Sequence, residues 1–112
     1  MNEFFEKINS KAKTARTNVN IARAVHREAI NSGLEDEGFK AVANLIISLM
    51  DQTINAANHV EERLQVLRSA GSCPNFLRDL GGTEQMADNA LANSKLAIEQ
   101  MKTAVVDAED WN

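Results

Sequence analysis

The stretch that decides the fold is residues 5–29, FEKINSKAKTARTNVNIARAVHREA. Small and apolar side chains recur in it at alternating steps of three and four residues, the spacing of one helix face. That face comprises Phe5, Ile8, Ala12, Ala15, Val19, Ala22, His26 and Ala29. The stretch therefore predicts a long amphipathic helix, which we expect to run from about Glu3 to Asn31 with Asn2 as its N-cap.

A second periodic segment follows a clear stop signal. Ser32 and Gly33 end the first helix, because glycine adopts the left-handed conformation of a helix C′ residue without strain. The acidic sequence LEDE at 34–37 then opens a second helix, since acidic groups are favourable at a helix N-terminus. We expect this helix over about 35–69, with a core face of Ala43, Ile46, Met50, Thr53, Ala57, Val60, Leu64 and Leu67.

The third periodic segment lies beyond the break AGSCP at 70–74. We expect one short helical turn at 75–80, closed by the glycines at 81–82. Thr83 then serves as the N-cap of a third helix that runs to about Asp110. Its expected core face is Ala87, Leu91, Ser94, Ile98, Met101, Val105 and Ala108.

Composition supports an all-α fold. Aromatic residues make up 4% of the chain, and it has one proline and five glycines, so long stretches lack both strand formers and helix breakers. A length of 112 residues fits one domain. We therefore predict a single helical-bundle domain over residues 1–112, an antiparallel, up-down-up bundle of three long helices.

This topology predicts specific contacts at both ends of the bundle. Phe76, Leu77 and Leu80 should pack near Phe4 and Phe5, because the second connection returns beside the first helix. At the other end, Trp111 should lie near Ile30, Leu34 or Phe39. We favour a structural cap over a partner-binding anchor for this single tryptophan.

The first half of the second helix is unusually apolar. Between residues 39 and 50, apolar side chains cover about 240° of the helical wheel, whereas a helix on the outside of a bundle needs a stripe of a little over 100°. Ala41, Leu45 and Leu49 lie beyond what two neighbouring helices should cover. We therefore predict self-association through these three residues, most simply as a homodimer.

A row of mostly basic residues, here called the basic flank, runs beside the apolar face of the first helix. It consists of Lys13, Arg16, Asn20, Arg23 and Arg27. Three explanations stay open: a solvated or internally ion-paired surface, a site for an acidic protein partner, and a contact to nucleic acid. Against the last, the chain carries a net charge of −4 and has few aromatic residues to stack on bases.

Candidate reactive residues are sparse. Cys73 is the only cysteine, so no intrachain disulfide can form, and a bystander thiol in a reducing compartment is expected. His26 lies on the apolar face of the first helix and is either structural or a pH-sensitive packing element. His59 and Glu62 are three residues apart, but their order reverses the Glu-x-x-His pattern of bundle metal sites, so we interpret them as solvated.

These observations exclude more functions than they indicate. No apolar run reaches the roughly 20 residues that span a bilayer, and no signal peptide is evident, so we expect a cytoplasmic protein without membrane contact. We expect neither cofactor, metal nor catalysis. The favoured function is a protein–protein interaction module of the adaptor, immunity-protein, antitoxin or phage-inhibitor kind, which masks or bridges a partner surface. The alternatives are a nucleic-acid-associated protein using the basic flank and a metal-binding bundle enzyme.

Overall fold

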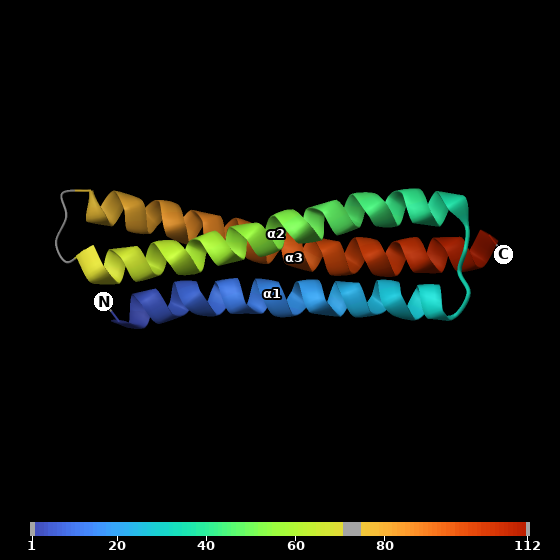
Figure 1. The fold of residues 1–112 in the computed structure, drawn as a ribbon, viewed down its shortest axis with the longest axis horizontal. Coiled ribbons are helices and arrows are strands. Elements are labelled where there is room, and N and C mark those ends of the chain that lie inside the picture. The colour runs from blue at the N-terminus through green and yellow to red at the C-terminus, as the bar shows by residue number, and fades with distance from the viewer. Residues whose placement is uncertain (1, 71–74, 112) are drawn as a thin grey trace.

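The computed structural model describes residues 2–70 and 75–111, and over these residues the chain is helical except at 32–36 and at Asn75. The helices are α1 (Asn2–Asn31), α2 (Glu37–Ala70) and α3 (Phe76–Trp111). They lie side by side as a rod of 59 × 19 × 15 Å (Figure 1). The predicted all-helical class and the three-helix bundle are therefore confirmed for the described part of the chain.

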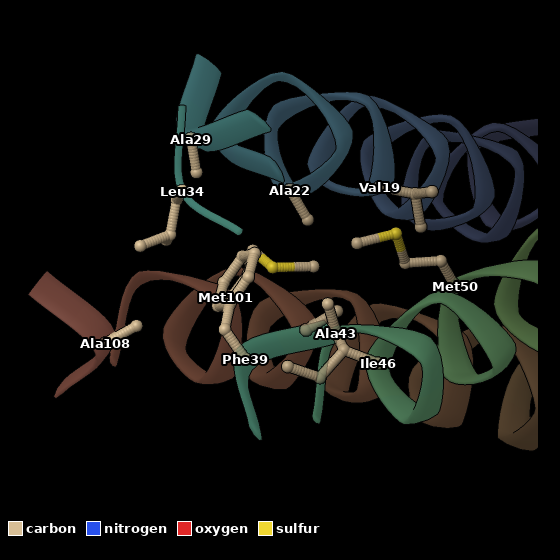
Figure 2. Packing of buried hydrophobic residues seen from close by; sticks show 11 residues of the cluster. Val19, Ala22, Ala29, Leu34, Phe39, Ala43, Ile46, Met50, Met101 and Ala108 are labelled. Carbon is tan, nitrogen blue, oxygen red and sulfur yellow. The ribbon is translucent and has the colours of Figure 1, made fainter. Parts of the chain in front are cut away.

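Two apolar clusters fill the rod, one toward each end. One gathers residues late in α1, early in α2 and late in α3, represented by Ala22, Phe39 and Met101. The other gathers residues early in α1, late in α2 and early in α3, represented by Phe5, Leu64 and Leu80. Figure 2 shows the first cluster, in which the side chains of Met50 and Met101 point toward α1.

The turn between α1 and α2 follows the local sequence closely. Gly33 has φ +91°, and its N–H donates to the Ile30 carbonyl at 3.0 Å, while the Leu34 N–H donates to the Ala29 carbonyl at 3.1 Å. These two bonds form a Schellman motif, and its usual apolar contact is supplied by Leu34 and Ala29, which share one core cluster. The predicted stop at Gly33 is thus confirmed.

The predicted start of α2 was two residues too early. The helix begins at Glu37, because Asp36 serves as its N-cap: the Phe39 N–H donates to Asp36 Oδ2 at 2.9 Å. Asn2, expected as the N-cap of α1, is instead its first helical residue.

The prediction of a separate turn at 75–80 followed by a new helix at Thr83 was wrong. A single helix, α3, starts at Phe76 and passes through Gly81 and Gly82 without a break. The Thr83 hydroxyl donates to the Asp79 carbonyl at 2.8 Å, so it bonds within the helix rather than capping it. Leu80 and Thr83 are both buried, and this packing outweighs the low helix propensity of the two exposed glycines.

A narrow polar layer separates the two apolar clusters. Ser94 is completely buried; its hydroxyl donates to the Leu91 carbonyl at 2.7 Å and accepts a bond from Asn18 Nδ2 at 3.1 Å. Thr53 of α2 is also buried and donates to the Leu49 carbonyl at 2.7 Å. The Asn18–Ser94 bond therefore joins α1 to α3 between the two clusters.

The predicted core face is confirmed in full on α2, in part on α3, and with one exception on α1. All face residues of α1 are buried except His26, which is half-buried and stacks on Phe39 with ring centroids 6.1 Å apart. On α2 the whole predicted face is buried. On α3 Leu91, Ile98 and Val105 are half-buried.

Contacts at the end of the bundle near the α2–α3 connection agree in part with the prediction. The rings of Phe5 and Phe76 meet edge to face at 6.1 Å, and Leu80 is buried in the same cluster as Phe5. Leu77, by contrast, is 75% exposed, so its predicted packing is wrong, and Phe4 lies largely at the surface. Cys73 and the side chain of Trp111 lie outside the described residues, so their predictions stay untested.

Candidate functional site

An open groove lies between the first half of α2 and the second half of α3. Its volume is about 730 Å³. We call it the α2–α3 groove. It is lined by Asp36, Gly38, Phe39, Val42, Leu45, Ile46, Leu96, Glu99, Gln100, Thr103, Ala104, Asp107 and Ala108.

Several large apolar side chains along this groove are exposed to solvent. Leu45 is 74% exposed, Val42 is 45% exposed and Leu96, across the groove on α3, is 42% exposed. Phe39 and Ile46 lie below them and belong to the core, so the floor is held by the bundle itself. The groove exists because α2 carries more apolar surface here than α1 and α3 can cover.

The charged side chains that line the groove are all acidic. Asp36 lies just before the start of α2, and Glu99 and Asp107 lie along α3, whereas the described residues of the lining include no lysine, arginine or histidine. Asp36 also accepts the capping bond from the Phe39 N–H, which keeps its carboxylate fixed at the start of α2. The groove therefore combines an apolar wall with an acidic rim.

The three residues predicted to mediate self-association occupy different environments. Leu45 lines the groove and is exposed, as predicted. Ala41 is exposed but lies outside the groove lining. Leu49 is half-buried and packs against the core cluster, so the bundle already covers part of it. Self-association stays a prediction, and Leu45 is the residue of this set with most surface to offer.

The basic flank is divided between paired and unpaired side chains. Arg16 lies across α2, where its Nη1 is 2.9 Å from Glu61 Oε1 and its Nη2 donates to the side-chain amide oxygen Oδ1 of Asn58. The buried Oε1 atom of Glu61 accepts no hydrogen bond, so its contact with Arg16 is an ion pair alone. Arg23 pairs with Asp51 of α2 at 3.4 Å.

The other members of the basic flank stay in solvent. Lys13, Asn20 and Arg27 are exposed, and none of them makes an ion pair or side-chain hydrogen bond within the described residues. Lys13 borders a smaller hollow of about 240 Å³, whose far side is formed by Arg68. Arg68 in turn lies over the Phe5 ring at 5.3 Å, so it is engaged in a cation–π contact.

A further α1 cation contacts α3 rather than α2. Lys11 Nζ lies 2.6 Å from Asp88 Oδ1. Its hydrogen bond to Asp88 raises the pKa of Lys11 above the ordinary value of 10.5, with the charges of Asp88 and Glu84 acting in the same direction. Together with the Arg16 and Arg23 pairs, this contact shows that α1 uses its basic side chains against both neighbouring helices.

No family model, curated protein or solved structure matches this chain.

The side chains that could bind a metal ion are scattered over the part of the chain that the structure describes. No group of three or more His, Cys, Asp or Glu side chains there is placed to hold a metal ion. His59 and Glu62, the spaced pair noted in the sequence, are both exposed on α2. None of the described helices contains a stretch long and apolar enough to cross a bilayer.

The α3 half of the groove was not predictable from the patterns noted in the sequence. The excess apolar width of α2 pointed to Leu45, but nothing singled out Leu96 or the acidic pair Glu99 and Asp107 on α3. Leu96 lies outside the predicted core face of α3, and that off-face leucine was the available signal. Which helix lies opposite Leu45 depends on how α3 packs, and that is a tertiary property.

Proposed function

We propose that the chain is a non-enzymatic protein-interaction module that holds a segment of another protein in the α2–α3 groove, masking that segment or bridging it to other surfaces. One observation carries the proposal: Leu45, Val42 and Leu96 are exposed together on facing walls of one hollow. Contiguous exposed apolar surface on a folded domain marks an interaction site, whereas isolated exposed apolar residues are ordinary.

The energetics favour an occupant for the groove. Fully burying a leucine side chain stabilises by about 1.5–3 kcal/mol relative to leaving it in water. Leu45 gains little of this inside the isolated bundle, because three quarters of it is exposed. A partner that covers Leu45 and its two neighbours recovers this free energy on binding.

The antiparallel, up-down-up order belongs to the proposal. Its support is the membership of the two core clusters, in which early α2 meets late α1 and late α3. The groove shows the same pairing of helix ends, since Asp36 and residues 38–46 at the start of α2 contribute to its lining together with residues 96–108 of α3. An arrangement in which consecutive helices run in opposite directions explains the contacts in both clusters and in the groove.

Site-specific photo-crosslinking tests this function. A photoreactive benzoylphenylalanine replaces exposed Thr103 in the groove or, as the matched control, exposed Asn55 of α2 outside it. In cells of the source organism, we expect a discrete protein adduct from position 103 and none from position 55. The adduct should disappear when Leu45→Glu is added. Equal adducts from both positions, or an adduct that persists with Leu45→Glu, would contradict docking in the groove.

The basic flank retains the two predicted alternatives, an acidic partner and nucleic acid. Internal pairing of Arg16 and Arg23 leaves Lys13 and Arg27 as its available cations. A mobility shift with mixed DNA and RNA at several salt concentrations tests nucleic-acid binding, because the salt dependence reports the phosphates engaged. A shift that Lys13→Glu/Arg27→Glu abolishes would favour that second function over the groove.

A further inference from the structure

Resting on the proposed function, we propose that the segment held in the α2–α3 groove is an amphipathic helix with basic residues along its edges. The groove selects the apolar face by its exposed leucine and valine walls. It favours positive charge because Asp36, Glu99 and Asp107 rim it, with no lysine, arginine or histidine among the lining residues that the structure describes. Such an occupant adds a fourth helix over one end of the bundle.

The length of the groove sets the length of the occupant. Its lining extends over residues 36–46, at the start of α2, and 96–108 of α3, which corresponds to roughly 15–18 Å along each wall at 1.5 Å per residue. About three turns of an incoming helix match this length. Isolated helices this short are marginal in water, so the occupant orders on binding or belongs to a folded partner.

The acidic rim also fixes the spacing of the basic residues. Glu99 and Asp107 are eight residues apart on α3, so cations seven or eight residues apart on one edge of the occupant face both. Asp36 lies on the α2 side of the groove, which places a third cation on the opposite edge near one end.

A second copy of this chain fits the groove poorly. A two-fold interface brings identical patches together, so the acidic rim would face another acidic rim. The basic helix that the chain does contain, α1, has its apolar face buried in the bundle and two of its arginines paired with α2. Charge complementarity therefore points to a different, basic partner segment.

Designed peptides test the charge preference separately from the groove itself. The first probe is a fluorescein-labelled helical peptide of about 14 residues, with leucines at steps of three and four and lysines seven residues apart on one edge. The second probe is identical except that glutamates replace the lysines. We expect saturable binding of the lysine peptide by fluorescence anisotropy, at least about ten-fold tighter than binding of the glutamate peptide at low salt.

Variants assign that binding to the groove. Leu45→Glu should abolish binding of the lysine peptide, and Glu99→Gln/Asp107→Asn should weaken it about three- to ten-fold. The matched control Glu28→Gln/Glu62→Gln removes two exposed charges outside the groove and should leave the affinity unchanged. Circular dichroism of each variant checks that the bundle stays folded.

The outcomes separate this inference from the proposed function. If both peptides bind equally and Leu45→Glu abolishes both, the groove is a docking site but the basic occupant is wrong. Preference for the glutamate peptide, or no binding of either peptide, overturns the basic helix as occupant, and the crosslinking experiment then decides the proposed function alone. A dimer in sedimentation velocity that Leu45→Glu dissociates would assign the groove to a second copy instead.

Discussion

Replacing both glycines inside α3 by alanine should stabilise the protein. Gly81 and Gly82 are exposed, have helical backbone conformations, and offer open space where a Cβ would be added. Alanine is favoured over glycine in a helix interior by about 0.8–1 kcal/mol per residue, partly because it restricts the unfolded chain. We therefore expect Gly81→Ala/Gly82→Ala to raise the free energy of unfolding by about 1–2 kcal/mol.

This stabilisation is large enough to measure. With an unfolding entropy of about 2.1 cal/mol/K per residue, a gain of 1–2 kcal/mol raises the Tm of a 112-residue domain by about 4–8 °C. Thermal melts followed by circular dichroism at 222 nm give the Tm. Urea titrations should show a higher midpoint at an unchanged m-value, which separates stability from a change in the compactness of the unfolded state.

A third glycine supplies a control of opposite sign. Gly33 also has open space around its Cβ position, but its φ of +91° is a conformation that alanine adopts only with strain. Gly33→Ala should therefore lower the stability by about 1–2 kcal/mol. If the double alanine variant instead lowers the Tm as Gly33→Ala does, α3 is broken at its glycines and the continuous helix is wrong.

Three further predictions concern single side chains. Met101→Ala should lower the free energy of unfolding, measured by urea titration, by about 2–5 kcal/mol because Met101 is fully buried. Leu45→Ala, at an exposed position, should change it by less than about 0.5 kcal/mol. Arg16→Met should lower the free energy of unfolding by about 0.5–1 kcal/mol because it leaves Glu61 of α2 without its ion-pair partner. The control Arg27→Met, at a residue without an ion pair, should leave the free energy of unfolding almost unchanged in the same titration. The hydrogen bond to Asp88 raises the pKa of Lys11 in the folded state, so this ion pair stabilises the folded protein below pH 10.5. The stabilisation is lost as the pH rises through the folded-state pKa. The Tm, measured at low salt across that range, should therefore fall more steeply for the wild type than for Lys11→Gln.

Much of the fold was readable in the sequence because the core is built from strict helical periodicity. The faces that begin at Phe5 on α1 and Ala43 on α2 are buried as their spacing predicts. The stop at Gly33 was equally clear, since a left-handed residue flanked by Ala29 and Leu34 is a local motif that needs no tertiary context. Such features depend on residues close together in the chain, and their physics is local.

Glycines in α3 show where local rules fail. Gly81 and Gly82 have the lowest helix propensity short of proline, so the sequence predicts a break at these positions. The break does not form, because Leu80 and Thr83 on either side pack into the bundle and hold the backbone helical. The free energy of that packing comes from other helices and is absent from the local sequence.

The sequence by itself determined that this chain forms three long helices, most of the faces that α1 and α2 bury, and that α2 has apolar surface to spare around Leu45. Tertiary structure decided what lies opposite that surface: Leu96 on the facing wall and an acidic rim of Glu99 and Asp107. It also decided that Arg16 and Arg23 are used inside the bundle, while Lys13 and Arg27 stay in solvent. The physical reason is that helix periodicity fixes the direction of each side chain relative to its own axis, whereas its partners depend on the rotation and register of separate helices, which core packing sets.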